Sequence, residues 1–65
     1  MLIVNGTAQE ISTPINLLTY LEEHNYAVDK IAIELNGAII SKAKYAKTIL
    51  NPNDKLEIVT FVGGG

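Results

Sequence analysis

Residues 30–41 read KIAIELNGAIIS, and they carry the clearest local pattern of the chain. Apolar residues recur at every second position up to Leu35, which is typical of a strand with one buried face. Asn36-Gly37 follows, and this pair favours a two-residue hairpin turn because both of its residues must adopt positive φ. Residues 38–41 then return as the second strand. The implied register places Leu35 opposite Ala38 and Ile33 opposite Ile40.

The first eleven residues have the same arrangement. Leu2-Ile3-Val4 is expected to be a strand, Asn5-Gly6 is a second hairpin turn, and residues 7–11 form the returning strand. The register that follows pairs Val4 with Thr7, and it puts Leu2, Val4 and Ile11 on one face of the hairpin and Ile3 on the other.

A single helix is expected between the two hairpins, over residues 14–24. Thr13 is a good N-cap, and Pro14 fits the first helical position because an N–H is not needed there. Asn25 can end the helix in the left-handed conformation. Three turns are too short to be stable alone, so the helix must pack on a sheet. Its apolar stripe consists of Ile15, Leu17, Leu18 and Leu21.

The C-terminal third holds a basic segment, a turn and a last strand. Lys42–Lys47 is expected to be a turn or one helical turn, and Asn51–Asp54 is dense in turn-forming residues. The last strand is expected over Lys55–Val62. Its side chains alternate, with Leu56, Ile58 and Thr60 on one face and Glu57, Val59 and Phe61 on the other.

This order of elements predicts an α+β fold of the β-grasp, or ubiquitin-like, type: a five-stranded mixed sheet with one main helix packed on one face. The first and last strands are expected to lie side by side and parallel in the middle of the sheet. Residues 1–62 then form the β-grasp domain, and residues 63–65 form a flexible C-terminal glycine tail.

The sheet face without the helix is expected to expose four apolar side chains. They are either scattered surface residues, which are common, or a contiguous surface that binds a partner protein. Three of them fall on adjacent or near-adjacent strands, which favours the partner-binding surface. The four residues are Ile3, Ile39, Val59 and Phe61.

Composition excludes several classes of protein. A chain of 65 residues, 48% of them hydrophobic, allows one small domain with little room for a substrate pocket of roughly 300–1,000 Å³. A net charge of −2 argues against a nucleic-acid partner. No apolar run approaches the roughly 20 residues of a membrane span, so we expect no membrane partner and a cytoplasmic location. Cysteine is absent, which rules out disulfides and thiolate metal sites.

The titratable residues do not suggest catalysis or metal binding. His24 has no partners at the spacing of a metal site or a catalytic triad. Glu22 and Glu23 are adjacent on the helix and point in different directions, so they cannot act as a pair. The basic segment with Tyr45 is expected to be solvated surface rather than a contact for acidic groups. We therefore expect no catalytic residue, no metal site and no enzyme activity.

Gly63-Gly64-Gly65 follows the last strand directly. Such a run is ordinarily a frayed end or a remnant of cloning. Extended, however, it reaches about 10 Å beyond the sheet, and it can enter a channel too narrow for other residues. The terminal carboxylate is a poor acyl donor, whereas its adenylate has a good leaving group. A chain without cysteine cannot hold sulfur as a persulfide, but it can hold sulfur as a C-terminal thiocarboxylate.

Three segments together form a specific combination: LIVNG at 2–6, AIELNGAII at 32–40, and DKLEIV at 54–59 running into FVGGG at 61–65. With these segments the whole chain resembles the ThiS family, the sulfur carrier proteins of thiamine (thiazole) biosynthesis. The departures keep charge, aromaticity and turn chemistry: Ser41-Lys42 and Tyr45 stand where the family often has Pro-Arg and Trp, and Asn53 stands where it usually has Gly.

The resemblance implies a carrier that binds no permanent cofactor. An E1-like adenylyltransferase would use ATP and Mg²⁺ to adenylate Gly65, a donor such as a cysteine desulfurase would supply sulfur, and thiazole synthase would receive it. Gly64 would precede Gly65 in the narrow channel. A carrier for molybdopterin synthesis and a non-covalent ubiquitin-like interaction module remain the alternatives. The residues expected to bind partners are Ile3, Val59, Phe61, Val62 and Gly63.

Overall fold

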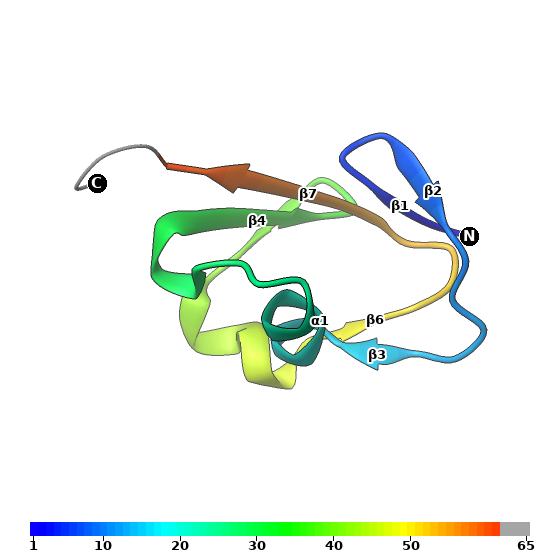
Figure 1. Cartoon of the computed structure of the whole chain (residues 1–65), viewed down its shortest axis with the longest axis horizontal. Helices are drawn as coiled ribbons and strands as arrows, with labels where there is room; N and C mark the ends of the chain where they lie inside the picture. The colour runs from blue at the N-terminus through cyan, green and yellow to red at the C-terminus, as the bar shows by residue number, and fades with distance from the viewer. Residues whose placement is uncertain (62–65) are drawn as a thin grey trace.

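The computed structural model describes residues 1–61, which form a five-stranded sheet with a helix against one face (Figure 1). The expected tail at residues 63–65, and Val62 before it, lie outside the described residues. The large sheet contains β1 (Leu2–Val4), β2 (Thr7–Gln9), β4 (Ile31–Leu35), β5 (Ala38–Ile40) and β7 (Lys55–Thr60). The remaining elements are β3 (Ile15–Asn16), α1 (Leu17–Glu23), β6 (Ile49–Leu50) and two 3₁₀ helices, η1 (Val28–Lys30) and η2 (Lys42–Lys47).

The strand order β2-β1-β7-β4-β5 confirms the predicted β-grasp topology. β1 runs parallel to β7 at the centre, and the other neighbouring strands are antiparallel. Both hairpin registers are confirmed, with Val4 opposite Thr7 and Ile33 opposite Ile40. The periodicity of two therefore placed each strand of the large sheet on the correct face, because a slip of one residue would have reversed each face. The short strands β3 and β6 were not predicted.

The two Asn-Gly turns have the backbone that their sequence predicts. Asn5 and Asn36 have φ of 49° and 52°, and the glycines after them have φ of 82° and 85°. Positive φ at both turn positions matches the twist of the flanking strands. Glycine adopts this conformation at little cost, and asparagine is the side-chain-bearing residue that tolerates it best.

The start of the helix differs from the prediction. Asn16, rather than Thr13, is the N-cap, and its Oδ1 accepts a hydrogen bond from the N–H of Thr19 at 3.0 Å. Residues 15 and 16 pair with β6 as the short strand β3 instead of forming the first helical turn. The Asn16 Nδ2 also donates to the carbonyl of Ala46 at 2.8 Å. These partners, about thirty residues away in sequence, move the helix start from residue 14 to Leu17.

Other element ends differ by one or two residues. β2 ends at Gln9 instead of Ile11, and Lys30 belongs to η1 instead of β4. β7 ends at Thr60, although the N–H of Phe61 still donates to the carbonyl of Lys30 at 2.8 Å. Asn25 follows the helix with φ of 62°, as predicted for the helix end.

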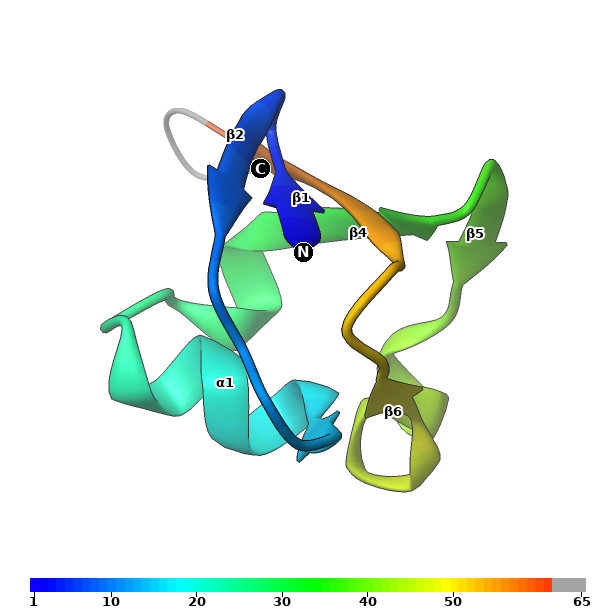
Figure 2. The same ribbon diagram turned by 90° about the vertical axis from the view of Figure 1, so that its right-hand side faces the viewer.

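Figure 2 shows α1 and η2 on one side of the large sheet. The core side chains lie between these helices and the sheet. Tyr45 belongs to this core, with 3% of its surface exposed, so the prediction of a solvated position for Tyr45 was wrong. The turns of η2 direct Tyr45 toward α1 while the neighbouring lysines stay exposed as expected. Burial raises the pKa of the Tyr45 hydroxyl. The other buried residues are Leu2, Val4, Leu17, Tyr20, Leu21, Ile31, Ile33, Leu50, Leu56 and Ile58.

Candidate functional site

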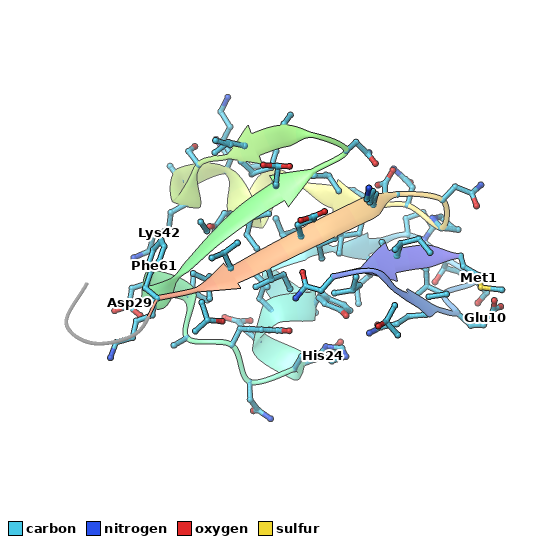
Figure 3. The ribbon with its side chains drawn as sticks, turned by 90° about the horizontal axis from the view of Figure 1, so that it is seen from above. Met1, Glu10, His24, Asp29, Lys42 and Phe61 are labelled. Carbon is cyan, nitrogen blue, oxygen red and sulfur yellow. The ribbon has the colours of Figure 1, made fainter. Side chains whose placement is uncertain are left out.

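The face of the sheet opposite α1 carries three of the five large apolar side chains that are exposed among residues 1–61, and Figure 3 views the molecule from that side. The other two are Met1 and Ile49. Within residues 1–61, no helix covers this face (Figures 1 and 2). Ile39 is 81% exposed, Val59 57% and Phe61 46%. Exposed apolar side chains indicate a protein-binding surface where they are contiguous, whereas isolated ones are common on any protein surface.

The strand register places these residues relative to one another. Val59 on β7 lies opposite Ala32 on β4, and Ile39 on β5 lies opposite Glu34 on β4. Phe61 is the next outward position after Val59 and stands at the end of β7 (Figure 3). Val59 and Phe61 therefore lie at the C-terminal end of β7, and Ile39 completes the group from two strands away, level with Glu57 near the middle of β7.

Ile3 lies apart from that group. It is half-buried, and it pairs with Ala8 on β2 and with Lys55 on β7. Lys55 is four residues before Val59, which is about 13 Å along a strand. The charged side chains of Lys55 and Glu57 occupy the outward positions between them. The four apolar residues thus form one group of three and one separate residue.

A shallow hollow opens on this face between β4, β5 and β7. Its volume of about 120 Å³ is well below the roughly 300–1,000 Å³ of a small-molecule site. The hollow is thus large enough to receive part of a side chain from another protein rather than a substrate. Its lining consists of Ala32, Ile33, Glu34, Ile39, Glu57 and Val59.

Glu34 and Glu57 form a pair that was not predicted from the sequence. Alternation alone places both on the open face, but their direct opposition depends on the pairing of β4 with β7. A predicted register between β4 and β7, based on the hydrophobic patterns of the two strands, could have identified this pair.

His24, the single histidine of the chain, has a structural setting at the helix end. Its Nδ1 lies 2.9 Å from the Tyr20 carbonyl oxygen, and its ring stacks on the Tyr20 ring with centroids 4.1 Å apart. Tyr20 in turn donates from its hydroxyl to Oε1 of Gln9 at 2.8 Å, and burial raises the pKa of that hydroxyl. Among residues 1–61 no three His, Cys, Asp or Glu residues are placed to hold a metal ion, and no helix is long and apolar enough to cross a membrane.

The predicted sulfur-carrying residues Gly64 and Gly65, and the predicted partner-binding residues Val62 and Gly63, lie outside the described residues. Val59 and Phe61 are exposed where the last strand ends, and Ile3 is half-buried near β2. Of the predicted site residues, the structure therefore places only those of the candidate docking surface, which are Ile3, Val59 and Phe61.

The family assignment comes from comparison with known proteins. The sequence pattern of the ThiS family matches residues 2–65. The chain belongs to the ThiS family. The ThiS fold is also seen in the crystal structure of the thiamine biosynthesis protein ThiS from Geobacter metallireducens. That chain superimposes with a TM-score of 0.83 at 27% identity, over 98% of this chain and 97% of that one.

ThiS-like sequence also occurs inside longer proteins. A thiazole synthase of Paramagnetospirillum magneticum is 39% identical over 64 residues, which are 98% of this chain and 20% of that protein. This chain thus spans about one fifth of that relative. An uncharacterized protein, ycf40, of Pyropia yezoensis is 37% identical over 62 residues, covering 95% of this chain and 87% of that one.

Proposed function

We propose that this chain is a sulfur carrier protein whose Gly65 carboxylate is adenylated, converted to a thiocarboxylate and used as a sulfur donor for thiazole formation in thiamine biosynthesis. The observation that carries the proposal is the match to the ThiS family over residues 2–65, which includes the glycine tail. The resemblance of the fold to a ThiS thiamine biosynthesis protein supports it.

The chemistry requires activation of the terminal carboxylate. The carboxylate attacks the α-phosphorus of ATP, and pyrophosphate leaves. The acyl-adenylate then carries AMP as a good leaving group, and displacement of AMP by hydrosulfide gives the thiocarboxylate directly. A persulfide donor instead forms an acyl disulfide, and a thiol reductant cleaves its S–S bond to release the thiocarboxylate. Since the chain has no cysteine, its own side chains cannot carry the sulfur as a persulfide. The carrier supplies the acyl group, and its partners supply the catalytic residues.

The proposal names three partners. An E1-like adenylyltransferase binds ATP and Mg²⁺ and adenylates Gly65, and a donor such as a cysteine desulfurase supplies the sulfur. Thiazole synthase receives it. The occurrence of a similar segment within proteins named thiazole synthase, in Paramagnetospirillum magneticum and Magnetococcus marinus, supports the third partner. All three would meet the carrier in the cytoplasm.

The open sheet face is the docking surface in this proposal. Val59 and Phe61 contact the partner, Val62 and Gly63 lead into its channel, and Gly64 and Gly65 reach the reacting atoms. Ile3 makes a separate contact at the β1 side. The exposure of Val59 and Phe61 supports this assignment, because neither side chain is needed to fill the core.

The proposal predicts a change in intact mass. Incubation with the adenylyltransferase, ATP, Mg²⁺ and a sulfur source is expected to increase the mass of the chain by about 16 Da, because one carboxylate oxygen is replaced by sulfur. Electrospray mass spectrometry measures this change, and omission of ATP is the control. A mass that stays constant with an enzyme that loads a ThiS protein of known activity would refute the carrier function.

A second prediction concerns Val59→Ser. Because Val59 is 57% exposed, we expect the free energy of unfolding to fall by no more than about 1 kcal/mol. Loss of its apolar contact is expected to raise the KM for the carrier in the loading reaction by about fivefold or more. The matched control is Ala38→Ser, an exposed apolar strand residue that shares a face with Leu35 on the other side of the sheet. An equal KM for both variants would place the docking surface elsewhere.

A further inference from the structure

Two carboxylates face each other at the centre of the open sheet face. Glu34 on β4 and Glu57 on β7 are directly opposite in the antiparallel register, and both are exposed. Side chains in this relation have Cβ atoms about 4.5–5.5 Å apart, and like charges placed so are destabilising. We therefore expect the pair to lower the stability of the free protein.

The two carboxylates form part of the hollow described above. Its exposed apolar walls are the side chains of Ile39 and Val59. Ile39 lies opposite Glu34 on the β5 side, and Val59 is the next residue after Glu57 on the same face of β7. The chain's own cation on the same face of β7, Lys55, lies on the far side of Glu57 from Val59 and does not line the hollow. The hollow thus combines apolar walls with two negative charges.

We propose that this hollow receives one arginine side chain of thiazole synthase when the carrier docks. The aliphatic part of the arginine would pack against Ile39 and Val59, and its guanidinium group would lie between Glu34 and Glu57. Arginine fits this combination better than lysine, because its planar group can donate to two carboxylates at once while its stem covers apolar surface. The small volume of the hollow has room for part of one side chain. This inference rests on the proposed sulfur carrier function.

Removal of the two negative charges is expected to affect stability and partner binding in opposite directions. Glu34→Gln combined with Glu57→Gln removes the repulsion within the free protein and keeps the shape of both side chains. The double variant should therefore melt at the same temperature as the wild type or higher. It should bind thiazole synthase less well, because the arginine loses both of its charged partners.

The experiment is a binding titration of the full-length carrier with thiazole synthase from the same organism, by isothermal titration calorimetry at low and high salt. The double Gln variant is expected to raise Kd about tenfold or more at low salt and to flatten its dependence on salt. The matched control, Glu22→Gln combined with Glu23→Gln, makes the same change in net charge on α1, and its Kd should stay within about twofold of the wild type.

Three outcomes would overturn the inference. A Kd of the Glu34/Glu57 variant within about twofold of the wild type would exclude the arginine contact, and an equal loss in the Glu22/Glu23 control would show an effect of net charge alone. A lowered melting temperature of the variant would show that the pair is structural. If the wild-type carrier is loaded with sulfur but its binding does not depend on Glu34 and Glu57, only this inference fails. If the wild type is not loaded, the proposed function itself fails.

Discussion

Removal of Gly64 and Gly65 is expected to abolish sulfur loading completely while the melting temperature stays at the wild-type value. The truncated chain still ends in a carboxylate, but that carboxylate is two residues closer to the sheet. Two extended residues span about 7 Å, so the carboxylate cannot reach a catalytic centre that accepts the full tail. Within residues 1–61 the buried residues of the core run from Leu2 to Ile58, so the contacts among these residues are kept.

Intact-mass measurement of the loading reaction, together with thermal unfolding, checks this prediction. Gly64→Val is a matched variant because it keeps the length of the tail and its terminal carboxylate. We expect it to block loading as well, since the added side chain cannot enter a channel shaped for glycine.

The same truncation separates the competing functions. A non-covalent ubiquitin-like module would keep its partner binding and its cellular role without the last two glycines. A strain that lacks the gene separates the two carrier functions: added thiazole should restore growth if the chain serves thiamine biosynthesis. Loss of molybdate-dependent respiration instead would indicate the molybdopterin carrier.

Asn5→Ala is expected to lower the free energy of unfolding by about 2–4 kcal/mol, although Asn5 is an exposed turn residue. The Asn5 Oδ1 accepts a hydrogen bond from the Ile58 N–H at 2.7 Å, and its Nδ2 donates to the Ile58 carbonyl at 3.2 Å. The side-chain amide thereby continues the pairing of β1 with β7 beyond Val4. Alanine loses both hydrogen bonds. It also adopts φ near 49° at a higher conformational free energy than asparagine does.

Asn5→Gly separates the two contributions. Glycine accepts the positive φ but cannot form the two side-chain bonds, so we expect a loss of about 1–3 kcal/mol. Urea denaturation followed by circular dichroism measures all three proteins. Equal stability of the alanine variant and the wild type would show that water replaces the Asn5 amide at β7. A glycine variant as stable as the wild type would assign the whole effect to backbone conformation.

The Asn-Gly turns show how far local sequence reaches. The backbone preference of Asn5-Gly6 and Asn36-Gly37 predicted the turns and, with strand alternation, the register of both hairpins. The second use of these asparagines was not predicted. The Asn36 Oδ1 accepts from the N–H of Lys55 at 2.8 Å, as Asn5 does from Ile58. Both bonds join a turn to β7. Because β7 is distant in sequence from both turns, the local pattern around each turn could not predict these bonds.

The helix shows the limit of such patterns. Thr13-Pro14 and Asn16 are both acceptable helix starts within the sequence, and the local preferences do not separate them. The choice of Asn16 follows from the pairing of residues 15 and 16 with β6 and from the Asn16 bond to Ala46. Tyr45 is similar, since a short basic segment does not reveal which of its side chains a helix will cover.

Alternation, turn residues and the glycine tail are local features, and they were sufficient to predict the β-grasp topology, the open face and the resemblance to the ThiS family. The grouping of Ile39, Val59 and Phe61 away from Ile3, and the opposition of Glu34 to Glu57, arise only when β7 is inserted between β1 and β4. That insertion brings together residues twenty or more positions apart, such as Ile39 with Val59 and Glu34 with Glu57. Their contacts depend on how strands share hydrogen bonds and buried area across the whole sheet, which no single segment specifies.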